Sequence, residues 1–156
     1  MLKLSALVLS AVMLFCGCSE QLELGEAFYN DVNNFEGVTL TIDHTTVTNK
    51  SVKFEILNTT DYEVCSGKPY LVALQVEQDD QWHNLKPKRD NRDSTSEAYV
   101  YYKNEPQMVE ANWVSDYGEL PKGHYRIVKG FFITAAESIN GKIESFILAD
   151  DFSINE

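Results

Sequence analysis

The stretch from Leu120 to Lys129 constrains the fold of this chain more than any other segment of the sequence. Pro121 fixes one backbone angle and Gly123 permits a positive one, so the chain can reverse its direction here. Tyr125 stands at the start of the apolar run that follows. The stretch therefore predicts a tight turn that leads directly into a buried strand.

Other segments alternate between apolar and polar residues, which is typical of strands with one buried face. The predicted strands are Val38 to Ile42, Val52 to Leu57, Tyr70 to Val76, a return strand from Trp82 to Leu85, Ala98 to Tyr102, Met108 to Val114, Tyr125 to Ile133 with a bulge at Gly130, and Ile143 to Leu148. No long helical pattern accompanies them. The sequence therefore predicts an all-β fold, an antiparallel sandwich of about seven strands.

The N-terminal residues differ in kind from the rest of the chain. Lys3 is the one charge in residues 1–17, and the apolar run from Leu4 to Phe15 is too short to span a bilayer as a helix. We therefore interpret residues 1–17 as a signal peptide.

The end of this segment resembles the lipobox of bacterial lipoproteins, in which a small residue precedes a cysteine that is acylated and becomes the mature N-terminus. Gly17 and Cys18 fit that pattern, whereas Phe15 and Cys16 depart from it. The resemblance implies that Cys18 carries the lipid and that the protein is anchored in the cell membrane, facing its extracytoplasmic side. A plain secretory signal and an uncleaved anchor are the alternatives.

Residues 18–36 are polar and acidic, with a few apolar side chains among them. Such a composition suits a hydrated tether between a lipid and a folded domain. Phe28 and Val32 have helical spacing, which allows a short helix from about Glu26 to Asn33. The folded domain is then expected over residues 37–156.

Net charge and cysteine content exclude a nucleic-acid-binding protein and a domain that is held together by a disulfide. Cleavage after Gly17 removes one lysine and no acid, which leaves 12 basic and 24 acidic residues and a charge of −12. Nucleic acid is therefore excluded as a partner, because a polyanion would be repelled. Cys16 leaves with the signal peptide and Cys18 takes the lipid, so Cys65 has no partner for an intrachain disulfide.

With the strands placed, the stretch from Gly118 to Lys129 resembles the penultimate strand of a bacterial immunoglobulin-like domain family. This family occurs in exported proteins and lipoproteins, mostly of Gram-positive bacteria. Further matching positions come in the same order, at Val38 to Thr41, at Val52, Phe54, Ile56, Asn58, Thr60 and Tyr62, and at Gln81 to Leu85. The resemblance implies an immunoglobulin-like sandwich from about Gly37 onward, here without a disulfide.

The resemblance also implies a role for Tyr125. It suggests a tyrosine corner, in which the hydroxyl of this residue bonds to the backbone of the preceding turn and fixes the crossing between the sheets. The family has no common enzymatic activity, so the resemblance implies no catalytic residue, no metal and no cofactor.

The sequence carries no recognisable catalytic motif, and we expect a protein that is not an enzyme. The favoured hypothesis is an interaction or accessory module for a protein or a cell-wall polymer, with an exposed aromatic patch formed by Tyr99, Tyr101 and Trp113. Trp82 is expected to fill the core or its rim, with a sugar-stacking platform as the alternative.

The alternative hypothesis is a small exported hydrolase or a metal-binding protein whose site is assembled only in the folded chain. Its candidate residues are His44, His83, His124, Asp90, Asp93 and Cys65. The histidines lack metal-ligand spacing and are expected to face solvent. Asp90 and Asp93 lie in the polar stretch from Lys86 to Glu97, which lacks the spacing of a calcium loop and is interpreted as a solvated loop.

Overall fold

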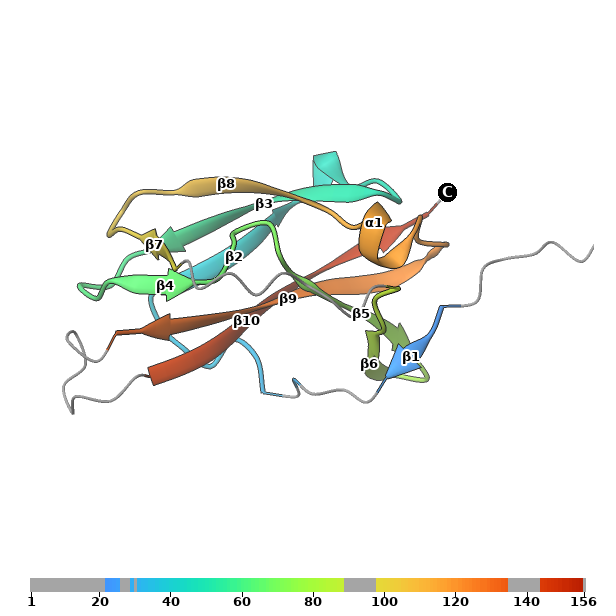
Figure 1. Ribbon diagram of the computed structural model, residues 1–156, viewed down its shortest axis with the longest axis horizontal. Helices are drawn as coiled ribbons and strands as arrows, with labels where there is room; N and C mark the ends of the chain where they lie inside the picture. Colours follow the sequence, from blue (N-terminus) through green and yellow to red (C-terminus); the bar gives the residue numbers. More distant parts are fainter. Residues whose placement is uncertain (1–21, 26–28, 30, 89–97, 135–143, 156) are drawn as a thin grey trace, which may run out of the picture.

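The computed structural model describes residues 22–25, 29, 31–88, 98–134 and 144–155. In this part of the chain two antiparallel β-sheets pack against each other as a sandwich (Figure 1). The larger sheet has the order β1-β6-β5-β9-β4-β7, with β10 on the other edge of β9, and the smaller sheet has the order β2-β3-β8. The predicted fold class, an immunoglobulin-like β-sandwich, is confirmed.

The elements have the following bounds. The larger sheet contains β1 (Leu24–Gly25), β4 (Val64–Ser66), β5 (Ala73–Gln78), β6 (Gln81–Leu85), β7 (Tyr99–Tyr101), β9 (Gly123–Ile133) and β10 (Glu144–Ile154), and the smaller contains β2 (Val38–Asp43), β3 (Ser51–Asn58) and β8 (Gln107–Asn112). Two short helical turns, η1 (His44–Thr46) and α1 (Val114–Tyr117), complete the described elements. Of these strands, β1 and β4 are not among the predicted ones, since two or three residues are too short for a period of two to show in the sequence.

The smaller sheet follows the predicted alternation. β2 and β3 form an antiparallel pair in which Leu40 lies opposite Ile56. Val52, Phe54 and Ile56 are fully buried, while the residues between them face outward. The sheet therefore supplies one half of the core through a single apolar face.

β9 is the central strand of the larger sheet. It pairs with β10 along all eleven of its residues, and its other edge pairs first with β5 and then with β4. Gly130 lies directly opposite Ile147 in an unbroken register, so the bulge predicted there is wrong. β10 continues to Ile154 because Leu148, Phe152 and Ile154 keep packing into the core.

Two other predicted strands have different bounds. β5 begins at Ala73 rather than Tyr70, because the backbone turns at Lys68 to Leu71 and Tyr70 is 51% exposed. β8 ends at Asn112, and the chain then enters α1.

The segment before β2 differs from the free tether that the sequence predicts. β1 pairs with β6, and the ring of Phe35 stacks on Phe146 with 4.0 Å between the ring centroids. Residues 31–33 are not helical, and the rest of the expected helix lies largely outside the described residues. Short apolar stretches spaced by acidic residues look like a hydrated spacer in the sequence, yet here they pack on the larger sheet.

Candidate functional site

A row of polar side chains crosses four strands on the outer face of the larger sheet. The register sets Asn84 beside Gln75, Gln75 beside Arg126, and Arg126 beside Asp151. Arg126 Nε donates to Gln75 Oε1 at 2.5 Å, and Gln75 Nε2 donates to Asn84 Oδ1 at 2.7 Å. Gln75 is fully buried and Arg126 is 8% exposed, although both point away from the core. Such buried polar groups are stable only when they are hydrogen-bonded, as these are.

His124 lies two residues before Arg126 on β9, between two carboxylates. Val76 pairs with Tyr125, so the next residue of β5, Glu77, falls beside His124. His124 Nδ1 is 2.6 Å from Glu77 Oε2, and Nε2 is 2.8 Å from Asp151 Oδ2. Hydrogen bonding with Glu77, and then with Asp151, raises the pKa of His124, because both carboxylates favour the imidazolium.

Trp82 completes this outer-face cluster. The guanidinium carbon of Arg126 lies 4.4 Å from the centre of the Trp82 ring, and the ring of His124 lies 5.3 Å from it at a tilt. The cation–π contact covers one face of the indole. This favours a rim-packing role for Trp82 over the sugar-stacking platform considered from the sequence.

The cluster is arranged for charge pairing rather than for catalysis. Both ring nitrogens of His124 bond to carboxylates, so the ring cannot also accept a proton from Ser153, which lies opposite it on β10. Among the residues that the structure describes, no group of three or more His, Cys, Asp or Glu side chains could hold a metal ion.

Among the described residues, those of the enzyme or metal hypothesis form no metal-binding group and lie on separate elements. His44 lies on η1, His83 on β6 and His124 on β9. Cys65 is buried on β4, where burial, and then Glu63, raises the pKa of its thiol, the opposite of what a nucleophile needs. Asp90 and Asp93 lie outside the described residues.

The predicted aromatic patch of Tyr99, Tyr101 and Trp113 does not form. Tyr101 is fully buried and packs edge-on against Phe131, and Trp113 is 2% exposed, with Nε1 donating to the Asn49 carbonyl at 2.9 Å. Tyr99 alone of the three is exposed, at 50%. The sequence could not separate Tyr99 from Tyr101, because alternation puts both on the same side of β7 and only Tyr101 reaches the hydrophobic core.

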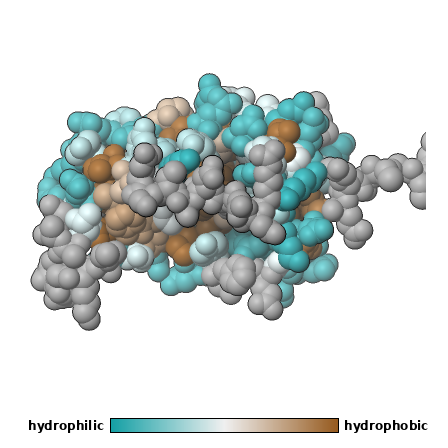
Figure 2. Space-filling model, viewed as in Figure 1, coloured by the Kyte–Doolittle hydropathy of each residue, from teal (hydrophilic) through white to brown (hydrophobic). Residues whose placement is uncertain are grey.

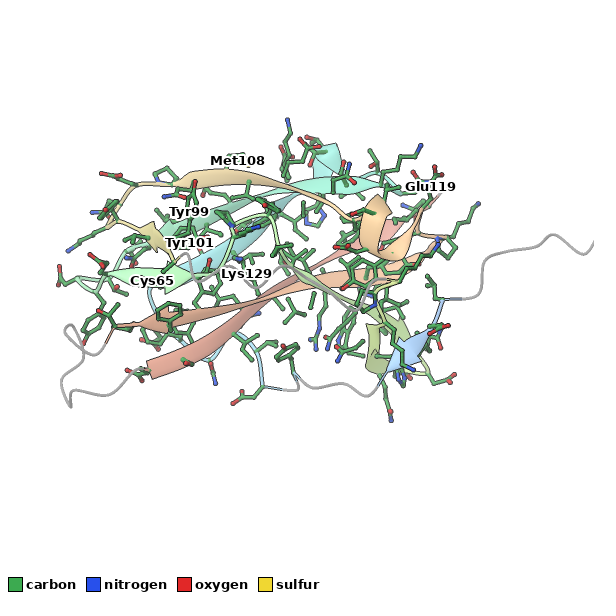
Figure 3. The ribbon with its side chains drawn as sticks, in the orientation of Figure 1. Cys65, Tyr99, Tyr101, Met108, Glu119 and Lys129 are labelled. Atoms are coloured by element: carbon green, nitrogen blue, oxygen red, sulfur yellow. The ribbon has the colours of Figure 1, made fainter. Side chains whose placement is uncertain are left out.

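Other large side chains are exposed instead. Tyr102 is 55% exposed at the end of β7, and Met108 is 58% exposed on the outer face of β8. Figure 3 shows Tyr99, Tyr101 and Cys65 at the end of the molecule that carries β4 and β7, far from Glu119. Figure 2 shows hydrophilic residues over most of the outline and hydrophobic residues gathered over β4, β9 and β10.

Tyr125 has the hydrogen bond that a tyrosine corner requires. Its hydroxyl donates to the Pro121 carbonyl at 2.8 Å, and burial raises the pKa of Tyr125 to about 12. Gly123 is not in the positive-φ region, contrary to the expectation from the sequence. A Cβ at Gly123 would instead lie 3.0 to 3.1 Å from the Tyr125 ring and hydroxyl, so this glycine makes room for the corner.

We predict that Tyr125→Phe lowers the free energy of unfolding by about 1 kcal/mol, since it removes one buried hydrogen bond and keeps the ring. Chemical denaturation measures the change. The control is Tyr102→Phe, which removes the hydroxyl of an exposed tyrosine. An unchanged midpoint for Tyr125→Phe would show that the hydroxyl does not hold the corner.

We also predict a pH-dependent contribution from His124. Its folded-state pKa is raised, so the stabilisation is complete below the ordinary histidine pKa of about 6.5 and is lost as the pH rises through the raised value. Urea midpoints of the wild type and of His124→Gln should therefore differ more at about pH 6 than at about pH 9. His44→Gln, which removes an exposed imidazole outside the cluster, is the control, and a difference that grows with pH would contradict the ion-pair assignment.

Lys129 is a buried amine that the sequence analysis did not single out. It is 4% exposed where β9 changes its neighbour from β5 to β4, and Nζ donates to the carbonyls of Lys68 and Leu71 at 3.0 and 3.1 Å. Burial lowers the pKa of Lys129 to about 8. The amine thus joins the segment before β5 to the centre of the sheet, where ladder hydrogen bonds are interrupted. Figure 3 shows Lys129 close to the middle of the molecule.

The chain matches a known protein family over most of its length. A family model described as a bacterial Ig-like domain matches residues 34–152. Neither the curated proteins nor the solved structures contain a match to the chain. Within the described part of the chain, no helix has the length and apolar character needed to cross a membrane.

Proposed function

The chain belongs to the bacterial immunoglobulin-like domain family, and from this membership we propose that it is a non-catalytic, lipid-anchored protein of the cell envelope. Its sandwich serves as an interaction module for a protein or an envelope polymer. Domains of this kind commonly mediate protein interactions and are typically non-catalytic. The lipid is attached at Cys18, and the domain faces the extracytoplasmic side of the membrane.

The observation that carries the proposal is the exposure of tyrosines at one end of the sandwich. Tyr99 and Tyr102 flank the buried Tyr101 on β7 and its end, and each exposes about half of its surface. Tyrosine contributes large contact area at low conformational cost, and it is enriched at protein interfaces. These two side chains are therefore the proposed contact residues, in place of the predicted set.

A photo-crosslinking amino acid at position 99 or 102, introduced in the full-length protein in its own cells, tests this proposal. Adducts of defined mass should form at both positions. The same group at Asp79, an exposed residue of the β5–β6 turn, is the matched control and should form none. Equal adduct formation at all three positions, or no adduct at any of them, would contradict the proposal.

A further inference from the structure

The segment before β2 is held on the sandwich from its first described residues. We call residues 22–25, 29 and 31–36 the N-terminal strap. In β1, Leu24 pairs with Leu85 and Gly25 with Asn84, and the Lys86 amide donates to the Glu23 carbonyl at 2.9 Å. Leu22 and Leu24 also pack against the hydrophobic core. The strap therefore extends the larger sheet at its β6 edge.

The rest of the strap is fixed at three further points. Arg126 Nη2 donates to the Tyr29 carbonyl at 3.0 Å. Asn33 donates its amide to the Ile147 carbonyl, and its side chain both donates to and accepts from the backbone of Ala149, at 2.8 to 2.9 Å. Together with the Phe35–Phe146 stack, these contacts hold the strap along the larger sheet from β6 to the free edge of β10.

Docking of the strap shortens the chain between the lipid and the folded domain. A free tether over residues 18–36 would allow the domain to lie up to about 65 Å from Cys18. With β1 in the sheet, only residues 19–21 separate Cys18 from Leu22, and this stretch spans at most about 14 Å when fully extended. The distance between an acylated Cys18 and the folded domain is thus set by the docked strap. The composition of residues 18–36 does not set it.

The place where the strap joins the larger sheet, at β1, also lies at one end of the molecule. Figure 1 shows β1 and β6 at one end of the long axis and the connection from β7 to β8 at the other. β9 runs between these ends, and its eleven residues cover about 35 Å. The charge of −12 that remains after cleavage repels the body of the domain from an anionic lipid surface.

We propose that the docked N-terminal strap holds the β1–β6 edge of the sandwich next to the membrane surface and directs the end that carries β7 away from it. This inference rests on the proposed acylation of Cys18. It goes beyond that function because it assigns a membrane-proximal edge and places the exposed Tyr99 and Tyr102 at the distal end, where a partner in the envelope can reach them.

Energy transfer from a single donor dye to an acceptor on lipid headgroups tests the orientation. The acylated full-length protein is reconstituted into vesicles that contain an anionic lipid, with the dye on Lys86→Cys, beside β1, or on Glu105→Cys, in the β7–β8 connection. Both positions are exposed, and the parent chain with its buried Cys65 gives the labelling background. Transfer should be several-fold stronger from position 86 than from position 105.

Two variants separate docking of the strap from simple attachment. About six Gly and Ser residues inserted after Ser19 lengthen the free chain without touching the sandwich, and transfer from position 86 should fall towards that from position 105. Leu24→Asp should have the same effect by releasing β1, whereas Met108→Asp, an acidic substitution on the exposed face of β8, should not.

Equal transfer from positions 86 and 105 in vesicle-bound protein would overturn the orientation while leaving the anchor in place. A protein that does not sediment with vesicles at all would overturn the proposed anchor itself. The two failures are therefore distinguishable in one set of samples.

Discussion

Replacing Asn58 with leucine is expected to destabilise the sandwich by about 3 to 5 kcal/mol, which lowers its melting temperature by about 15 °C. Asn58 is fully buried at the end of β3 and makes hydrogen bonds with all of its polar side-chain atoms. Nδ2 donates to the carbonyls of Tyr62 and Tyr101, each at 2.8 Å. Oδ1 accepts from the amide and the hydroxyl of Thr60 at 2.9 and 2.7 Å.

These bonds join the two sheets at the point where the chain passes from one to the other. Asn58 belongs to the smaller sheet, Tyr101 lies on β7 of the larger sheet, and the Asn104 amide donates to the Asn58 carbonyl at 2.7 Å. A leucine side chain has a similar size but supplies no donor, so the buried carbonyl of Tyr101 and the partly buried carbonyl of Tyr62 lose their partner. Because of this loss, the free energy of unfolding should fall by much more than it does for an ordinary surface substitution.

Thermal unfolding followed by circular dichroism measures the effect. Asn34→Leu is the matched control, because Asn34 is exposed and its side chain donates to the neighbouring Asp31. It should change the free energy of unfolding by less than about 0.5 kcal/mol. If Asn58→Leu melts within a few degrees of the wild type, the buried bonds do not hold the crossing between the sheets.

Cys18→Ser is expected to move the protein from the membrane fraction to the soluble extracytoplasmic fraction. A serine cannot form the thioether that carries the lipid. Each buried methylene of an acyl chain contributes about 0.8 kcal/mol to membrane binding, and two chains are needed for a stable anchor. If Cys18 carries the proposed lipid, its loss should therefore abolish retention rather than weaken it.

Fractionation of cells that express the wild type or a cysteine variant measures this change. Cys16→Ser and Cys65→Ser are the controls. Cys16 precedes the expected cleavage site, and Cys65 is buried on β4, so both variants should stay with the membrane. Retention of Cys18→Ser in the membrane fraction would show that another part of the chain supplies the anchor.

The sequence predicted the sandwich because its longer strands carry their burial in an alternating pattern. β2 and β3 bury every second residue, β9 is buried along most of its length, and the turn before Tyr125 has the residue types that such a turn needs. The short strand β4 was not recognisable, because three residues contain too little alternation. The docking of β1 was missed for the same reason.

The outer-face cluster depended on register, which the sequence does not display. Glu77, His124 and Asp151 lie far apart along the chain, and they meet because Val76 pairs with Tyr125 and Asp151 with Arg126. An inward or outward direction could be predicted for each side chain, but its cross-strand neighbour could not. The exposed aromatic set was wrong for a related reason, since the position of Tyr101 in the core and of Tyr99 at its edge depends on tertiary packing.

We propose that this immunoglobulin-like domain is held at the membrane by a lipid on Cys18. Intact-mass and peptide mass spectrometry of the protein purified from the membrane fraction tests it most directly. The expected result is a mature chain that begins at Cys18 and carries two or more acyl chains on that residue. An unmodified chain that begins at another residue would contradict the claim.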